Sequence, residues 1–291
     1  MAVLAGRMPK RNRSSPFLVT LLVLAWPVFA DEQDWRPTNP ENTAVLALGA
    51  GAVVIELNTE FAPATVAQFK RLVRKGFYDG LDFYRVIDGF VAQGGDGSDI
   101  GKQSDEPTIK AEFERDWSND LPFAPVQEPD LFAPETGFVN GFAVARESAA
   151  GKAWLIHCPG VVAMARGNDA DSSRTDFYIV IGQSPRYLDR NLTIFGRVVF
   201  GMEHVQRIRR GPPSNNGIID DAQARSTIRS LRMAADLPST RRPKVQVRDS
   251  NSESFAALLK ARRHREADFF HHTPPPVLDV CQVPNSGRVA P

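Results

Sequence analysis

The stretch Phe83-Tyr-Arg-Val-Ile-Asp-Gly-Phe-Val-Ala-Gln-Gly-Gly-Asp96 decides the fold of this 291-residue chain. It places one cation, Arg85, among aromatic and aliphatic residues, and Gln93 follows on the same stretch. Alternation along a strand predicts that Arg85 and neighbouring apolar side chains face a shared groove. Such a groove suits a neutral, apolar ligand that needs one strong hydrogen-bond donor. The competing interpretation is that Arg85 reaches solvent or pairs with Asp88 or Asp96.

Short β-like runs lie on both sides of this stretch, and two segments have helical periodicity. The predicted helices cover 62–75 and 202–209, the first with Pro63 in its first turn and Gly76 at its end. The predicted strands cover 44–48, 53–57, 83–87, 90–93, 160–166, 177–181, 193–200 and 227–233. The pattern predicts a mainly β fold, a closed antiparallel eight-stranded barrel capped by two α-helices.

Two regions exceed what such a barrel needs. Residues 103–158 are rich in proline and acidic residues, so we expect a long irregular insertion there. Residues 236–291 form a C-terminal extension with one predicted helix, 254–265, whose end is basic. That basic end is either a solvated helix face or a surface for acidic partners or lipid head groups.

The N-terminus has the features of an export signal. A basic cluster, Lys10-Arg-Asn-Arg13, precedes an apolar run over 17–29 and the small residue Ala30. We therefore expect a signal peptide over 1–30 and a periplasmic protein. An uncleaved anchor is the alternative, but the run is shorter than the ~20 residues of a spanning helix. After cleavage we expect no stable membrane insertion.

Removing residues 1–30 leaves 31 basic against 34 acidic residues. This balance argues against a nucleic-acid partner. Only two cysteines occur, Cys158 and Cys281, both after the predicted signal. In an oxidising compartment they form a disulfide more readily than a metal site, which usually needs four ligands. Two buried free thiols remain the alternative.

The stretch 83–96 resembles the central signature of cyclophilins, which have Phe-His-Arg, then Gly-Phe, then Gln-Gly-Gly-Asp at this spacing. The resemblance continues upstream through Ala62-Pro-Ala-Thr-Val-Ala-Gln-Phe69 and Lys75-Gly-Phe-Tyr-Asp79. Downstream, 160–165, 176–179, 187–189 and 195–198 keep the family's order. It covers about residues 43–235 and implies a cyclophilin-like domain there, in a divergent bacterial member of the family.

The resemblance implies a peptidyl-prolyl cis/trans isomerase that assists folding of exported proteins. Its expected catalytic residues are Arg85, which stabilises the twisted prolyl amide, and Gln93, which holds the peptide carbonyl side. An apolar proline pocket and substrate-binding rim are expected from Phe90, Val91, Ala165, Arg166, Asp176, Tyr178, Tyr187, Leu188 and Leu192. The expected partners are proline-containing polypeptides, with no cofactor and no metal, and the protein is expected to be a monomer.

This chain departs from the family at several rim positions. It has Tyr84 for the family's His, Arg166 for Asn, Asp176 for Gln, Tyr178 for Phe, Tyr187 for Trp and Leu192 for His. A carboxylate at 176 could either orient Arg85 or compete for it. The alternative function is therefore a low-activity module on a cyclophilin fold, a chaperone that binds proline peptides or part of an envelope complex.

Overall fold

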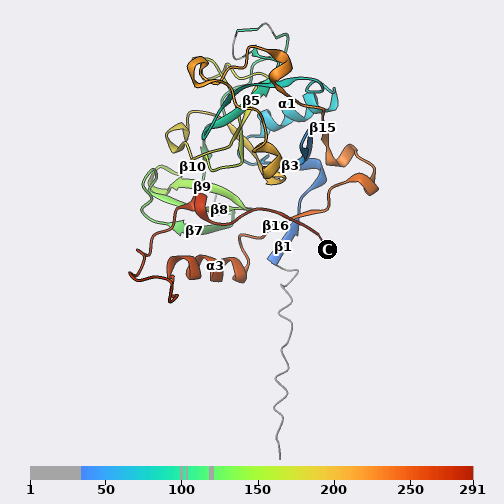
Figure 1. Ribbon diagram of the computed structural model, residues 1–291. Helices are drawn as coiled ribbons and strands as arrows, with labels where there is room; N and C mark the ends of the chain where they lie inside the picture. Colours follow the sequence, from blue (N-terminus) through green and yellow to red (C-terminus); the bar gives the residue numbers. More distant parts are fainter. Residues whose placement is uncertain (1–33, 99–100, 103, 118–120, 291) are drawn as a thin grey trace, which may run out of the picture. The chain divides into compact units, whose positions relative to one another are not determined.

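The computed structural model describes residues 34–98, 101–102, 104–117 and 121–290, so the predicted signal peptide lies outside the described residues (Figure 1). Nine strands form one antiparallel sheet in the order β14-β4-β5-β12-β11-β13-β3-β2-β15. Their bounds are β2 (Thr43–Leu48), β3 (Gly51–Leu57), β4 (Asp82–Ile87), β5 (Val91–Gly95), β11 (Val161–Met164), β12 (Phe177–Val180), β13 (Ile194–Phe200), β14 (Ser226–Thr227) and β15 (Ser230–Met233).

The two edges of this sheet are brought together by the chain itself. Edge strands β14 and β15 are separated only by Ile228 and Arg229. The Ile228 N–H donates to the Leu81 carbonyl beside β4, and the Arg229 N–H donates to Ala47 of β2. The sheet therefore curls until its edges meet at this segment. The predicted mainly β, antiparallel fold is confirmed. The curled sheet has nine strands where eight were predicted, and among the described residues β14 and β15 are not paired with each other.

Helix α1 (Pro63–Arg74) packs against the inner face of the curled sheet. Its buried side chains include Val66, Phe69 and Leu72, and the Phe69 ring lies against Phe177 and Phe195. The second helix, α2 (Met202–Val205), is shorter than the predicted 202–209. It ends early because the chain turns after it, and the Arg209 N–H donates to the Ser226 hydroxyl oxygen instead of to a helical carbonyl.

The insertion is not irregular, and that prediction was wrong. It contains a second antiparallel sheet in the order β6-β10-β9-β8-β7. The strands are β6 (Arg115–Asp116), β7 (Phe123–Gln127), β8 (Glu135–Val139), β9 (Phe142–Glu147) and β10 (Lys152–Leu155). Proline suggested a loop, but Pro125 lies on the edge strand β7, where a missing N–H removes no bond from an inner ladder.

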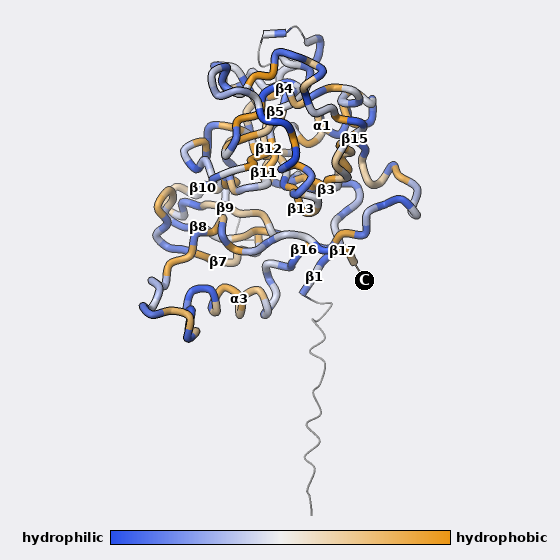
Figure 2. Tube along the Cα trace, viewed as in Figure 1, coloured by the Kyte–Doolittle hydropathy of each residue, from blue (hydrophilic) through white to orange (hydrophobic). Residues whose placement is uncertain are grey.

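The insertion sheet has two apolar faces. One face, including Val139, Val144 and Leu155, packs on the outer face of the curled sheet. The other face, including Phe138, Trp154 and Ile156, packs against Phe255 of α3 (Glu253–Arg263) and against the segment 278–283. Figure 1 shows α3 beneath β7 and β8, and Figure 2 shows hydrophobic residues concentrated along β11 and β12. The insertion is thus the middle layer of a three-layer stack.

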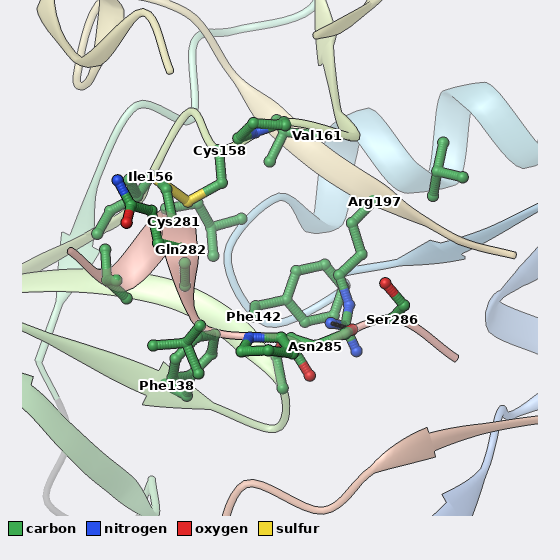
Figure 3. Close-up of a pocket in the computed structure, with 18 of the residues that line it drawn as sticks. Phe138, Phe142, Ile156, Cys158, Val161, Arg197, Cys281, Gln282, Asn285 and Ser286 are labelled. Atoms are coloured by element: carbon green, nitrogen blue, oxygen red, sulfur yellow. Dashed lines mark hydrogen bonds between the residues drawn. A yellow bond between two sulfur atoms is a disulfide. The ribbon is translucent and has the colours of Figure 1, made fainter. Parts of the chain in front are cut away.

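A third sheet joins the two ends of the described chain. Strand β16 (Val245–Arg248) pairs with β1 (Trp35–Pro37) on one side and with β17 (Arg288–Val289) on the other. From β1, Arg36 forms an ion pair of 2.6 Å with Glu56 on β3, and Arg197 on β13 bonds the same carboxylate at 2.9 Å. The C-terminal extension is also bound by a disulfide between Cys158 and Cys281, visible in Figure 3. Among the described residues, no helix has the length and apolar character needed to cross a bilayer.

Glu56 predicts how stability depends on pH. Burial raises the pKa of Glu56, but Arg197 and Arg36 outweigh burial, so its pKa lies below the ordinary 4.5. The unfolded chain therefore binds this proton more tightly than the folded protein. The stabilisation is complete above the unfolded pKa and is lost as the pH falls through the folded pKa.

We expect Glu56→Gln to lower the free energy of unfolding at pH 7 by about 3–5 kcal/mol, because it leaves Arg197 buried without its carboxylate. It should also flatten the fall of Tm from about pH 5 to about pH 3. Urea and thermal unfolding would measure both effects. Glu41→Gln, at an exposed ion pair with Arg74, is the control and should change stability by less than about 1 kcal/mol. Equal effects of the two substitutions would contradict the prediction.

The disulfide predicts a cross-linked peptide pair. Non-reducing peptide mapping of the purified protein should recover the Cys158 and Cys281 peptides as one species that separates on reduction. The bond spans 123 residues, and closing so long a loop stabilises by roughly 4–5 kcal/mol in the chain-entropy model. Recovery of both cysteines alkylated without reduction would refute the bond.

Candidate functional site

A β-bulge places Arg85 on the outer face of the curled sheet. Phe83 on β4 pairs with Gly94 of β5, but Arg85 pairs with Gln93, so Tyr84 is the extra residue. Phe83 and Val86 both lie in the inner core. Strict alternation from Phe83 would send Arg85 into that core, and the bulge prevents this. The outward-facing position of Arg85 therefore depends on a local irregularity that simple alternation does not predict.

Three functional side chains follow one another across neighbouring strands. Arg85 on β4 is opposite Gln93 on β5, and Gln93 is opposite Tyr178 on β12. Residues directly opposite in an antiparallel pair project on the same face. The sheet register thus aligns a cation, an amide and an aromatic ring in a single row on the outer face.

The hydrogen bonds of Gln93 fix how its amide is oriented. Arg85 Nη1 donates to Gln93 Oε1 at 2.9 Å, and Gln93 Nε2 donates to the Tyr84 hydroxyl at 2.8 Å. A guanidinium can only donate, so the amide oxygen of Gln93 must face Arg85. Gln93 is 2% exposed, and this pairing satisfies both ends of its buried amide. Tyr84, where the family has His, therefore positions Gln93.

Arg85 is held from its other side by the loop that precedes β14. Its Nε donates to the Asn216 carbonyl at 3.2 Å, and Nη2 lies 3.4 Å from Asn216 Oδ1. Asp88 instead pairs with Arg210, and Asp96 accepts from Thr175 and Ser98. Among the described residues Arg85 forms no ion pair. Arg85 is partly exposed, and its N–H groups outside these bonds can meet a ligand.

An apolar patch adjoins this row. Val91, Ala165 and Tyr178 belong to one buried cluster, and Phe90 and Leu192 pack against it while remaining partly exposed. These five residues, all predicted from the sequence, are brought together. The insertion sheet contributes to the same cluster through residues such as Phe142 and Leu155.

The turn that carries Phe90 is fixed by a close backbone approach. The Phe90 carbonyl accepts from the Ile181 N–H, and the Gly89 carbonyl accepts from the Gln183 N–H. A Cβ on Gly182 would lie 1.7 Å from the Gly89 carbonyl oxygen. Only glycine fits there, so Gly182 determines where Phe90 lies.

The remaining predicted residues have varied positions. Asp176 is buried, and its carboxylate accepts from the Gly97 N–H and the Ser98 hydroxyl. It therefore supports the loop after β5. Arg166 donates to the Asn191 carbonyl, which ties two rim loops together. Tyr187 is 69% exposed and Leu188 is partly buried, both in the 3-10 turn Arg186–Leu188.

Sequence reasoning missed two residues of the site. Asn216 contacts Arg85 although 131 positions separate them, and no local pattern signals that contact. The second is His157, whose Nε2 lies 2.9 Å from the Tyr178 hydroxyl. The tyrosine at 178 was the available signal, because a buried hydroxyl needs a partner.

A cavity of about 270 Å³ lies elsewhere, between the insertion sheet, β13 and the segment 280–286. Figure 3 shows the disulfide at one end and Arg197 beside Phe142 at the other. Apart from the two cysteines, it contains none of the predicted site residues. Within the described ranges, no group of three or more histidine, cysteine or acidic side chains could hold a metal ion.

The fold and site define a class of protein, a curled antiparallel sheet with an outward arginine beside an apolar patch. Comparison with known proteins identifies the family. The family model described as cyclophilin type peptidyl-prolyl cis-trans isomerase/CLD matches residues 43–232. A probable peptidyl-prolyl cis-trans isomerase of Brucella suis is 36% identical over 183 residues, covering 62% of this chain and 78% of the relative. Peptidyl-prolyl cis-trans isomerase B of Bacillus subtilis is 32% identical over 159 residues, covering 55% and 84%.

A solved structure is similar over nearly the whole chain. The crystal structure of cyclophilin AquaCyp293 from Hirschia baltica has a TM-score of 0.72 at 30% identity, and the match covers 90% of this chain and 96% of that one. The chain belongs to the cyclophilin-type peptidyl-prolyl cis-trans isomerase family. It is an isomerase of that type, and proline-containing peptides are the substrates of its class.

The close approach at Gly182 predicts that a methyl group added there destabilises the protein more than one added at a glycine with open space. Gly182→Ala should destabilise the protein by about 1–3 kcal/mol, because the Gly89 turn must move away. Gly167→Ala is the matched control, since its Cβ would meet only the Ser172 hydroxyl at 3.5 Å. Thermal unfolding of both variants would measure the difference, and equal Tm values would contradict the structure at this turn.

Proposed function

We propose that Arg85 accelerates prolyl isomerisation by hydrogen-bonding the twisted prolyl amide, while the apolar patch holds the proline ring. The observation that carries this proposal is the row Arg85, Gln93 and Tyr178 across β4, β5 and β12, beside Phe90. It combines one donor-rich cation with an apolar surface. These are the two features that a neutral proline substrate needs.

The chemistry requires no nucleophile and no cofactor. Amide resonance opposes rotation about the prolyl bond with a barrier of about 20 kcal/mol. In the twisted transition state the proline nitrogen loses conjugation and becomes a hydrogen-bond acceptor. A site that bonds this nitrogen only in the twisted state lowers the barrier, and each ~1.4 kcal/mol of such preference gives tenfold in rate.

The held geometry of Arg85 supports this role. Gln93 and Asn216 fix the guanidinium from two sides, so little reorganisation is needed when the substrate twists. Gln93 also has its amide orientation set, which suits a residue that holds the peptide beside the reacting bond. Asp176 is engaged by Gly97 and Ser98, which favours a supporting role over competition for Arg85.

We further propose that the protein acts as a monomer in the periplasm, on exported proteins. The basic cluster and apolar run before Ala30 support export. The disulfide supports an oxidising compartment.

The decisive variant is Arg85→Ala, which should lower kcat/KM on an Xaa-Pro peptide at least about tenfold. Arg85→Lys should also be impaired, because an ammonium group lacks the planar donor fork. A protease-free isomerisation assay measures both. Affinity for the peptide should change less than the rate, because the apolar patch is intact.

The control is Arg241→Ala, an exposed arginine of the C-terminal extension, which should retain wild-type activity. Unchanged catalysis in Arg85→Ala would refute the assigned site. A wild-type protein that binds the peptide without accelerating its isomerisation would instead select the alternative function, a binding module on this fold.

A further inference from the structure

A chain of buried polar groups connects the apolar patch to the insertion. Tyr178 bonds His157, and His157 Nδ1 lies 2.9 Å from Asp189 Oδ1. Asp189 Oδ2 accepts from Arg186 Nε at 2.7 Å, and Arg186 Nη2 pairs with Asp130 at 3.0 Å. The side chains of His157, Asp189, Arg186 and Asp130 are 0–8% exposed. His157 and Asp130 belong to the insertion, whereas Tyr178 belongs to the curled sheet.

The partners of His157 determine its tautomer. A carboxylate only accepts, so the nitrogen facing Asp189, Nδ1, carries the hydrogen. In the neutral ring Nε2 is then an acceptor, and the Tyr178 hydroxyl donates to it. Burial, followed by the nearby Asp189 charge, holds the pKa of Tyr178 well above its ordinary value, so the hydroxyl keeps this proton.

Without His157 as a partner, the Tyr178 hydroxyl would be an unsatisfied polar group in the apolar patch. Tyr178 is 4% exposed, and a buried hydroxyl without a hydrogen-bond partner lowers the stability of the folded protein by about 1–3 kcal/mol. The His157 and Tyr178 rings are nearly parallel, 8° between planes, with centroids 6.2 Å apart. The polar atom is thereby engaged on the insertion side, and the rest of the ring packs with Val91 and Phe90.

Asp189 links the same histidine to the rim. It accepts from the backbone N–H of His157 at 2.9 Å and ends the turn Arg186–Leu188. That turn carries Tyr187 and Leu188. His157 therefore contacts the rim through the Asp189 carboxylate and the apolar patch through the Tyr178 hydroxyl.

We propose that His157 is a positioning residue that sets the floor of the proline pocket, by drawing the Tyr178 hydroxyl away from the substrate. The insertion thus determines how apolar the pocket is and how tightly it binds proline. The inference rests on the proposed function, because it assigns what positions that same pocket. His157 itself touches no substrate.

The test is a cycle of variants assayed on an Xaa-Pro peptide. His157→Leu removes the acceptor, so the Tyr178 hydroxyl must find a partner in the groove. We expect KM to rise about 5–10-fold with kcat within about twofold, since Arg85 is untouched. His271→Leu, at an exposed histidine of the C-terminal extension, is the control and should leave KM unchanged.

Rescue separates positioning from simple loss of structure. His157→Leu also removes a bond to Asp189, so it should lower Tm, and that loss persists in any background. The KM increase should not persist: His157→Leu with Tyr178→Phe should have a KM within about twofold of Tyr178→Phe alone. An unchanged KM in His157→Leu, or a KM penalty of equal size in both backgrounds, would overturn the proposal.

A measurement on the wild-type protein tests the proposal even if the variants fail to fold. Nitrogen-15 NMR of the histidine rings should find the His157 proton on Nδ1, and a proton on Nε2 with bare Nδ1 would overturn the proposal. Failure here is distinguishable from failure of the proposed function. If Arg85→Ala still slows catalysis while His157→Leu leaves KM unchanged, only the role of His157 is lost.

Discussion

Strands β11 and β12 are apolar on both faces, and the rest of the structure depends on burying both. Their alternate residues, such as Val162 and Ile179, fill the inner core, while Val161, Ala163 and Val180 point outward. An uncovered apolar outer face is unfavourable by roughly 25 cal/mol for each Å² exposed. The insertion sheet packs on that face. In the apolar patch next to Arg85, Phe90 and Leu192 remain partly exposed.

Covering one apolar face creates another to be covered. The insertion sheet alternates as well, so its far face, with Trp154 and Phe138, needs a partner. Helix α3 and the segment 278–283 supply it, and β16 and β17 secure the remainder of the extension beside β1. The C-terminal extension is therefore a structural requirement of the insertion, and the two regions form one continuous set of layers around the domain.

Local patterns were enough to predict the strands of the curled sheet and α1, because both depend on alternation or helical periodicity. The residues of the apolar patch were predicted from the resemblance to cyclophilins. The bulge at Tyr84 could not be predicted that way, since a one-residue shift leaves composition unchanged. The many prolines of the insertion led to the wrong prediction of an irregular loop. The position of Pro125 on an edge strand matters more than the number of prolines. His157 and Asn216 act through contacts distant in sequence, and a single chain offers no signal for such pairs.

The disulfide also has a topological consequence. It closes a covalent ring from Cys158 to Cys281 that contains Tyr178, Arg166 and Tyr187 but leaves out β4 and β5, which carry Arg85 and Gln93. The exposed loop 167–171 lies inside this ring. A protease that cuts the loop once therefore opens the ring without releasing a fragment, and the two halves of the site stay on one covalently connected molecule.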